Sequence, residues 1–305
     1  MCKLIVVGSM NMDVVSDVKQ FPQPGETIGS SGTAFYPGGK GGNQAVAAAR
    51  SGALCAMVGA VGTDPFGDSL IAGLADSGVQ TDAVMRVEGT SGLALITVNE
   101  DGENTIVLSA GANGRLAAGD VERLADWEEA DAVLLQNEIA WETTEAVIVA
   151  ASSKGVRVLF NPAPARPLPE HIFPHLDTLV MNETEASLIT GISVHDAASA
   201  AAAAQWAIRQ GTSSVIITLG EAGCFYLNEE GGSHLVPAFR VKAVDTTAAG
   251  DTFIGAYAAA SSVCIAAEQA LTYASAAAAL AVTGAGAQSS IPEKRQVEQF
   301  LQQHV

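Results

Sequence analysis

"DTLVMNETEASLITG", residues 177–191, holds the pattern that decides the fold class. Residues 177–182 are a short apolar run that ends in a polar residue, which is typical of a strand buried on both faces. A helix candidate follows at once over 183–190, with Glu183 and Glu185 in its first turn, where the helix dipole favours acidic side chains. A buried strand that leads directly into a helix is the repeating unit of a parallel α/β sheet.

The same unit recurs along most of the chain. We therefore predict an α/β fold with a Rossmann-like, mostly parallel sheet and helices on both of its faces. The strand candidates are 3–9, 56–62, 131–136, 156–161, 177–182 and 214–220; the helix candidates are 43–52, 65–77, 143–153, 183–190 and 195–210, with two Ala-rich helices over 250–283.

Two segments, at about 13–37 and 90–110, break this alternation because they lack a helical period. They contain β-branched runs, and the second one has a hairpin signal around Asp101-Gly102. We expect short antiparallel strands outside the main sheet, which form a small β-sheet lid over the cleft. The outer face or edge of this lid is a candidate surface for a homodimer.

Composition limits the class of protein. The 305 residues include 48% hydrophobic ones and carry a net charge of −18, which disfavours nucleic-acid binding. The four cysteines lie far apart, and the apolar run after Lys3 is too short for a signal peptide or a membrane span. We expect one α/β domain over 1–305, in a cytoplasmic protein without a membrane or nucleic-acid partner.

Ligands of open α/β sheets bind beyond the carboxyl ends of the strands. Asn182, Gly220 and the residues after Gln136 follow strand candidates directly, so we expect them at the edge of the cleft. The turn after Thr218, in TLGEAG, predicts either a simple β-turn or a ledge for a nucleotide base and phosphates.

The glycine-rich stretch PGGKGGNQAVAAARSG, residues 37–52, surrounds Lys40 with glycines that let a ligand approach the backbone. Asn43 can cap the following helix or hydrogen-bond outward. A flexible turn before a helix is an equally good interpretation, because Gly41 stands where a phosphate loop needs Ser or Thr.

The stretch GSMNMD, residues 8–13, follows the first strand candidate. Asn11 and Asp13 have the spacing of two side chains on one face of an extended segment, where they could clamp vicinal hydroxyls. An Asx-turn that leaves the strand explains the same residues.

Asn182 and Glu185 are similarly open to two interpretations: a helix start, or a pair that holds waters on Mg²⁺.

The stretch DTTAAGDTF, residues 245–253, places Asp251 at the start of an Ala-rich helix, after three small residues. Free N–H groups in the first turn of a helix bind anions, and small side chains let a phosphoryl group reach them. Asp251 at the same end could take a proton from an attacking hydroxyl. An ordinary acidic residue in a first helical turn is the simpler alternative.

The glycine-rich stretch at residues 37–52 and the stretch DTTAAGDTF resemble the two signatures of the ribokinase/pfkB family of carbohydrate kinases. The resemblance extends from VVGSMNMD to GAQSSIP and includes GETI, GAN, NPAPAR, NETEA and ITLGEAG. It implies an ATP-dependent sugar kinase that phosphorylates D-ribose at O5 with ATP and Mg²⁺. Two departures are the Gly at position 42, often Ala in the family, and the polar Asn137, where Leu is usual.

The resemblance also implies roles for single residues. Asp251 is the catalytic base, and the amides of Ala248, Ala249 and Gly250 form an anion hole. The sugar hydroxyls are bound by Asn11, Asp13, Gly39, Lys40, Asn43 and Glu138; phosphates and Mg²⁺ by Asn182 and Glu185; the nucleotide by Thr218, Gly220, Gly223 and, near the adenine, Ser275.

An activating K⁺ beside the anion hole is implied in the same way. Asp245 and Ser290 match its side-chain ligands, and Thr247, Ala281, Gly284 and Gly286 match its carbonyl donors. Bound K⁺ would order the loop whose amides form the anion hole.

Three alternatives remain at this point. The enzyme could act on deoxyribose, fructose or a nucleoside such as adenosine, although the Asn11 and Asp13 pair favours a sugar with 2- and 3-hydroxyls. The chain could be a sugar sensor without catalysis, since a fold alone does not determine activity. A dinucleotide-dependent dehydrogenase is disfavoured, because GSMNMD stands where Gly-x-Gly-x-x-Gly is required.

Overall fold

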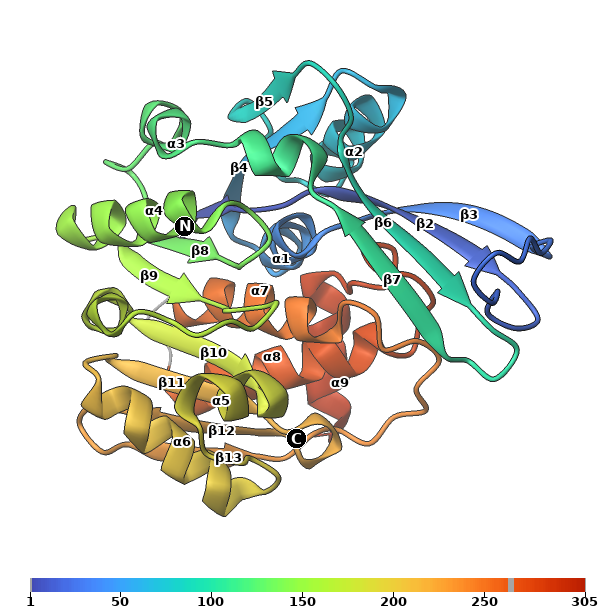
Figure 1. Cartoon of the computed structure of the whole chain (residues 1–305). Helices are drawn as coiled ribbons and strands as arrows, with labels where there is room; N and C mark the ends of the chain where they lie inside the picture. The colour runs from blue at the N-terminus through green and yellow to red at the C-terminus, as the bar shows by residue number, and fades with distance from the viewer. Residues whose placement is uncertain (1, 263–265, 305) are drawn as a thin grey trace.

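The computed structural model describes residues 2–262 and 266–304 and has a large sheet with helices on both faces (Figure 1). Its nine strands lie in the order β13-β12-β11-β10-β9-β8-β1-β4-β5. All neighbours from β5 to β11 pair in parallel, and β12 and β13 add an antiparallel edge. The strands are β1 (Lys3–Val7), β4 (Leu54–Gly62), β5 (Val84–Val87), β8 (Ala132–Leu135), β9 (Arg157–Phe160), β10 (Thr178–Asn182), β11 (Ser214–Thr218), β12 (Cys224–Asn228) and β13 (Ser233–Val236).

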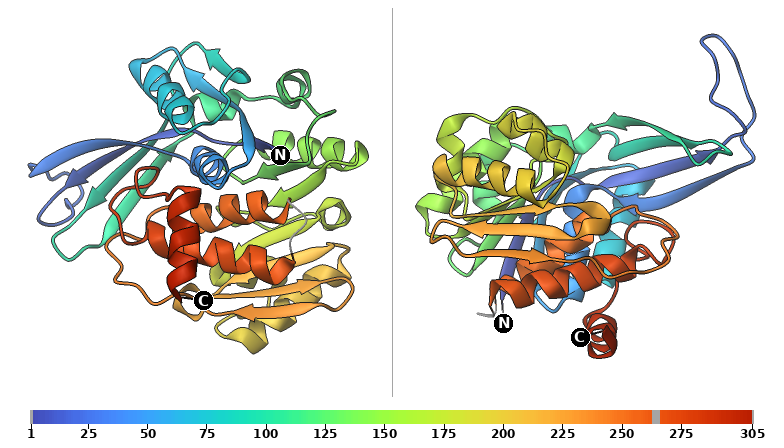
Figure 2. Two further views of the ribbon diagram at one scale, coloured as in Figure 1. Left: turned by 180° about the vertical axis from the view of Figure 1, so that it is seen from behind. Right: turned by 90° about the horizontal axis from the view of Figure 1, so that it is seen from below.

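Two hydrophobic cores lie on the two faces of this sheet, which is why its central strands carry apolar side chains on both sides. Along β1, Leu4 and Val6 belong to one core, whereas Ile5 and Val7 belong to the other. Helices α1, α7, α8 and α9 cover the first face, and α3, α4, α5 and α6 cover the second (Figures 1 and 2). The helices are α1 (Lys40–Arg50), α2 (Pro65–Asp76), α3 (Ala118–Leu124), α4 (Trp141–Ser153), α5 (Glu183–Thr190), α6 (Ala197–Arg209), α7 (Ala249–Ser261), α8 (Ala267–Ala281) and α9 (Lys294–His304).

The predicted fold class is confirmed, with two kinds of difference. Strands β5 and β13 and helices α3 and α9 have no counterpart in the sequence prediction. Helix α1 begins at Lys40 rather than Asn43, because Gly39 adopts a positive φ of 86° and already serves as the N-cap. Asn43 therefore lies inside the helix and does not cap it. Cys264 lies outside the described residues.

A second, four-stranded sheet in the order β3-β2-β6-β7 extends away from the main sheet (Figure 1). It is built from the two segments that lack helical period, and Figure 2 shows the loop between β2 and β3 (blue) projecting from it. Its strands are β2 (Asn11–Asp17), β3 (Gly32–Gly38), β6 (Gly92–Val98) and β7 (Asn104–Ser109).

The pairing within this small sheet corrects one expectation. β2–β3 and β6–β7 are antiparallel as predicted, and the turn at Gly102 joins the second pair. The central pair β2–β6 is parallel. Both of its strands follow strands of the parallel main sheet, β1 and β5, and so leave the same edge in the same direction.

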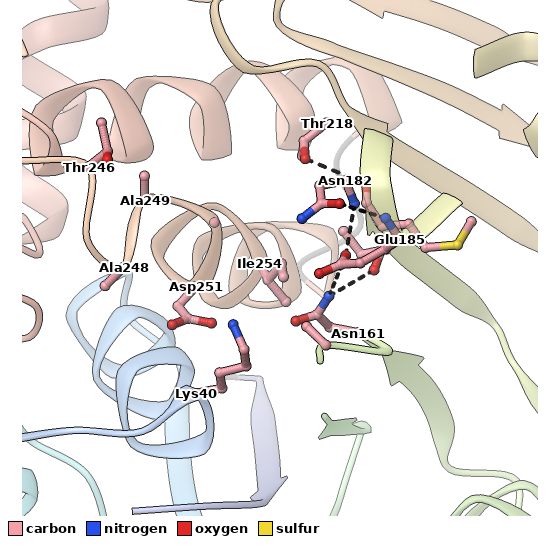
Figure 3. A pocket seen from close by; sticks show the side chains of 14 residues that line it. Lys40, Asn161, Asn182, Glu185, Thr218, Thr246, Ala248, Ala249, Asp251 and Ile254 are labelled. Carbon is pink, nitrogen blue, oxygen red and sulfur yellow. Dashed lines mark hydrogen bonds between the residues drawn. The ribbon is translucent and has the colours of Figure 1, made fainter. Parts of the chain in front are cut away.

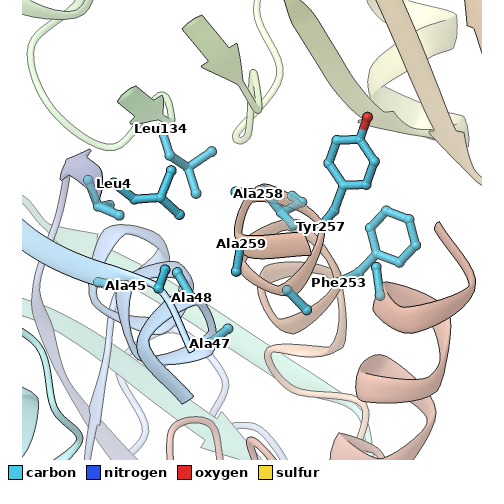
Figure 4. Close-up of a cluster of buried hydrophobic side chains, with 14 of the residues drawn as sticks. Leu4, Ala45, Ala47, Ala48, Leu134, Phe253, Tyr257, Ala258 and Ala259 are labelled. Carbon is cyan, nitrogen blue, oxygen red and sulfur yellow. The ribbon is translucent and has the colours of Figure 1, made fainter. Parts of the chain in front are cut away.

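Helices α1 and α7 pack closely because small residues face each other between them. Ala45, Ala47 and Ala48 of α1 lie against Ala258 and Ala259 of α7 (Figure 4). On α7, a Cβ on Gly255 would come within 2.4 Å of the Gln44 carbonyl oxygen and 2.6 Å of the Ala47 Cβ. This contact joins two segments that are about 200 residues apart in the chain.

We predict that Gly255→Ala lowers the free energy of unfolding by about 1–3 kcal/mol, because the added methyl group forces the two helices apart. The matched control is Gly119→Ala on α3, where no atom lies within 4 Å of the added Cβ. The control should stabilise the protein by about 0.4–1 kcal/mol. Urea denaturation measures both changes, and equal stability of the two variants would contradict the packing argument.

Candidate active site

A cavity of about 260 Å³ opens at the carboxyl ends of β10 and β11, beside the first turn of α7 (Figure 3). Its position agrees with the rule that ligands of parallel sheets bind beyond the strand ends. The wall consists of Lys40, Asn161, Ala163, Val180, Met181, Asn182, Glu185, Thr218, Thr246, Ala248, Ala249, Gly250, Asp251 and Ile254.

Asp251 lies in the first turn of α7 and is held from α1. Its Oδ2 accepts a hydrogen bond from Asn43 Nδ2 at 3.0 Å, and its Oδ1 accepts one from Gln44 Nε2 at 2.9 Å. The carboxylate is 8% exposed, yet it belongs to the cavity wall. It is therefore held in one orientation and still has free lone pairs for a ligand.

The turn that leads into α7 has an unusual backbone. Ala248 is its N-cap and adopts the left-handed conformation, with φ 59° and ψ 12°, which few non-glycine residues do. A Cβ on Gly250 would meet no atom within 4 Å, so the helix start is open on that side. The Ala249 N–H donates to the Thr246 carbonyl at 3.2 Å, so one of the three amides predicted for the anion hole already has a partner.

Asn182 and Glu185 form a reciprocal cap at the start of α5. Asn182 Oδ1 accepts from the Glu185 N–H at 2.8 Å, and Glu185 Oε2 accepts from the Asn182 N–H at 2.9 Å. The two interpretations of this pair are thus compatible, because both side chains also line the cavity. The cap leaves the Asn182 amide nitrogen, which Figure 3 shows on the cavity side, to donate to a ligand.

On the other side of Asp251, Asn11 and Asp13 lie on the same face of β2. The Asn11 Oδ1 accepts from Asn113 Nδ2 at 2.7 Å, which leaves its own amide nitrogen for a ligand. Asn113 is held in turn by the Met10 N–H and carbonyl. Sequence reasoning did not single out Asn113, because only the structure shows that this polar side chain is buried.

Gly39 and Glu138 connect this side to the start of α1. A Cβ on Gly39 would come within 2.7 Å of the Asn11 backbone nitrogen, so the close approach requires glycine. Glu138 Oε2 accepts from Ser9 Oγ at 2.6 Å and from the Lys40 N–H at 3.1 Å. The structure therefore brings the six predicted hydroxyl-binding residues into one continuous region around Asp251.

Three ionisable groups in this region have shifted pKa values. The negative charge of Asp251 is the main reason why the pKa of the Lys40 amine is raised, although burial opposes this. Burial raises the pKa of Glu185, with hydrogen bonds from Asn182 and the charge of Lys40 acting against it. Burial, followed by the charges of Glu138 and Asp251, raises the pKa of Asp13 to about 7.

The residues matched to a monovalent cation site also lie together. Asp245 Oδ1 accepts from the Thr247 N–H at 2.9 Å, and its Oδ2 accepts from the Gly286 N–H at 2.9 Å. Desolvation raises the pKa of Asp245, but the hydrogen bonds from Thr247 and Gly286 outweigh it and hold the pKa below its ordinary value. A Cβ on Gly284 would lie 3.2 Å from the Ser290 Cβ, and the Ala281 carbonyl accepts from the Gly284 N–H at 3.1 Å.

The predicted nucleotide residues are only partly gathered at the cavity. Thr218 lines it, whereas the wall does not include Gly220, Gly223 or Ser275. Gly220 and Gly223 flank the predicted turn between β11 and β12. Ser275 is buried on α8.

Further side chains, which sequence reasoning did not assign, complete the site. Asn161, the first residue of the NPAPAR stretch, lines the cavity, and Gln44 and Gln136 lie behind it. Within residues 2–262 and 266–304, no group of three His, Cys, Asp or Glu side chains could hold a metal ion. Within the same part of the chain, no helix is long and apolar enough to cross a membrane.

Comparison with known proteins adds independent information. The family described as "pfkB family carbohydrate kinase" matches residues 1–294. A ribokinase from Haemophilus influenzae is 40% identical over 301 residues, which cover 98% of each chain. A deoxyribokinase from Salmonella typhi is 38% identical over 301 residues, again 98% of each chain.

Among solved structures, the fold resembles that of Arabidopsis thaliana ribokinase complexed with ribose and ATP. The TM-score is 0.92 at 32% identity, and the match covers 99% of both chains. The α/β fold with a small separate sheet is therefore shared with this structure.

We predict that the Asp13 carboxyl titrates with a midpoint near 7 in the ligand-free protein. Carbon-detected NMR of ¹³C-labelled aspartate measures this midpoint. Glu138→Gln should lower it, because one of the negative charges that oppose ionisation is removed. The exposed control Glu229→Gln should leave it unchanged. A midpoint near the ordinary aspartate value of 3.8 would contradict the described environment.

Proposed function

The chain belongs to the pfkB family of carbohydrate kinases, and we propose that it transfers the terminal phosphoryl group of ATP to O5 of D-ribose. The assignment as an ATP-dependent sugar kinase follows from relatives that match almost the whole chain. The observation that carries the proposed chemistry is the Asp251 carboxylate, held in the first turn of α7 at the cavity wall.

In the proposed step, Asp251 accepts the proton of the sugar hydroxyl group while the hydroxyl oxygen attacks the γ-phosphorus of ATP. The new O–P bond forms while the bond between the γ-phosphorus and the bridging oxygen breaks, and ADP leaves with the electron pair. Lys40, whose ammonium group points toward Asp251 in Figure 3, and the amides at the start of α7 stabilise the charge on the moving phosphoryl group.

Mg²⁺ fits the side of the cavity opposite Asp251, where Asn182 and Glu185 line the wall. It keeps several waters and binds through few carboxylates, so a site without a protein-built metal cage suits it. Glu185 would offer a carboxylate to those waters, and the free amide nitrogen of Asn182 would donate to a phosphate oxygen. When bound, the ion neutralises charge on the nucleotide phosphates.

The choice of sugar depends on the hydroxyl clamp. Asn11 and Asp13 present a donor and an acceptor on one strand face, which suits vicinal 2- and 3-hydroxyls. The similarity to a deoxyribokinase supports 2-deoxyribose as the second candidate. A site that bonds a 2-hydroxyl disfavours the analogue that lacks it, because its own polar groups are then unpaired.

We also propose that K⁺ activates the enzyme from the cluster around Asp245. Carboxylate and carbonyl oxygens are ligands for hard cations, and the lowered pKa keeps Asp245 ionised. The Gly286 N–H and the Thr247 N–H already hold this carboxylate beside the α7 turn. A cation there would favour the same loop conformation as a bound phosphoryl group.

A homodimer through the small sheet is supported by its exposed apolar side chains. Phe35, Leu95 and Val107 lie in one row across the sheet and are 55%, 47% and 64% exposed. Every residue of the edge strand β7 is exposed as well. Apolar groups in such a continuous row indicate a protein contact.

We expect Asp251→Asn to lower kcat by roughly 10²–10⁴-fold, since the amide cannot accept the hydroxyl proton. Sugar binding, measured by calorimetry without ATP, should persist because the amide retains the size of the carboxylate. The exposed Asp76→Asn on α2 is the control and should keep full turnover. Turnover of Asp251→Asn close to that of the unmodified enzyme would exclude Asp251 as the base.

For the dimer, we predict that the double change Leu95→Lys and Val107→Lys gives a monomer in sedimentation velocity, because two charges then lie in the contact. Leu235→Lys on β13, at a residue that is 56% exposed, is the matched control and should leave a dimer. A monomeric unmodified chain, or a double variant that remains dimeric, would refute this interface.

A further inference from the structure

Three amide side chains form a buried chain behind Asp251. Gln44 and Gln136 are 0% exposed, and Asn161 is 4% exposed. Gln44 Nε2 donates to Asp251 Oδ1 at 2.9 Å and to Asn161 Oδ1 at 3.3 Å, and Gln44 Oε1 accepts from Gln136 Nε2 at 2.7 Å. The two side-chain N–H groups and the carbonyl oxygen of Gln44 therefore all form hydrogen bonds within the protein.

The backbone determines which way these amides point. Asn161 Nδ2 donates to the Val180 carbonyl at 3.0 Å, and a carbonyl oxygen can only accept. Asn161 must therefore turn its Oδ1 toward Gln44, and Gln44 must meet it with an N–H. A reversed Gln44 would set its carbonyl oxygen against two other oxygens, Asp251 Oδ1 and Asn161 Oδ1.

Asp251 needs such support because the terminal torsion of an aspartate is broad and does not orient the carboxylate by itself. Of its two donors, Asn43 is also assigned to the sugar, so its hydrogen bond can be shared with a ligand. Gln44 is 0% exposed and its amide is fully paired with Asp251, Asn161 and Gln136, so its hydrogen bond to Asp251 is independent of what the cavity holds.

We propose that Gln44, oriented by Gln136 and Asn161, is a positioning residue that fixes the Asp251 carboxylate for proton transfer. This inference rests on the proposed kinase function. The same chain continues to the phosphate side, since Asn161 Nδ2 also lies 3.5 Å from Glu185 Oε2. Gln44 thus connects Asp251, the proposed proton acceptor, through Asn161 with Glu185 on the phosphate side of the cavity.

The first test is Gln44→Met, which keeps the length of the side chain and removes both N–H donors. We expect kcat to fall roughly tenfold to a hundredfold, since a misplaced catalytic group costs about that much. KM for ATP and for the sugar should stay within about twofold, because Gln44 touches neither substrate.

The second test is a double-mutant cycle with Gln136→Met. This change removes the donor that orients Gln44, so kcat should fall by a smaller factor than in Gln44→Met. In the double variant, kcat should equal that of Gln44→Met alone, because Gln136 acts only through Gln44. If the two changes were independent structural defects, their fold reductions in kcat would instead multiply.

The third test is Gln44→Glu, which faces Asp251 with a second carboxyl group. The acid limb of the kcat–pH profile should move to higher pH by about one unit, since like charges oppose ionisation. The other charged groups around Asp251 are Lys40 of α1, Glu185 of α5, Asp13 of β2 and Glu138, and they are the same in both proteins. A residue with a merely structural role would lower activity without moving this limb.

Thr212→Val, just before β11 and so at the opposite end of that strand from the cavity residue Thr218, is the control for loss of a buried polar group, and it should keep kcat and the pH profile unchanged. The proposal is overturned if Gln44→Met stays within about twofold of the unmodified kcat, or if the effects of Gln44→Met and Gln136→Met multiply. If Gln44→Met does not fold, an unchanged kcat in Gln136→Met overturns it equally. Absence of turnover in the unmodified enzyme would refute the kinase function instead.

Discussion

The close contact between α1 and α7 is the constraint on which the site depends. Gly255 lets the two helices approach, and the Ala residues beside it leave room for the backbones to pack. Only at this separation can Asn43 and Gln44 reach the Asp251 carboxylate, which follows them by 208 and 207 residues. The two glycine- and alanine-rich motifs therefore depend on each other, because α1 supplies the two amide donors that hold the Asp251 carboxylate at the start of α7.

The cavity concentrates negative charge in a chain that already carries a net charge of −18, so an anionic nucleotide can bind there only beside positive groups. Asp251, Glu138 and Glu185 lie around the ammonium group of Lys40, and their charges raise its pKa against the effect of burial. Burial and mutual repulsion raise the pKa of Asp13 to about 7. Lys40, the amides of the α7 turn and the proposed metal ions must together supply the positive field for the phosphates. This requirement makes cation binding an integral part of the proposed chemistry.

Much of this could be predicted from residue patterns, because buried parallel strands are continuously apolar and end in polar residues such as Asn182. The small sheet was also predicted, but the parallel pairing of β2 and β6 depends on where each strand leaves the main sheet. Asn43 was a candidate helix cap, and the positive φ of Gly39 moved the helix start. Asn113, Gln44 and Gln136 were not assigned, because polar side chains carry no sequence signal of burial; only tertiary packing shows that they orient Asn11 and Asp251.

Phosphorylation of ribose at O5 is tested most directly by identifying the product with phosphorus NMR. The enzyme is incubated with ATP, Mg²⁺ and either D-ribose or 2-deoxyribose, in potassium and in sodium buffers. We expect ADP together with a sugar phosphate whose phosphorus couples to the two protons on C5, formed fastest with ribose and potassium. A phosphate coupled to the single anomeric proton, or no sugar phosphate from folded enzyme, would contradict phosphorylation at O5.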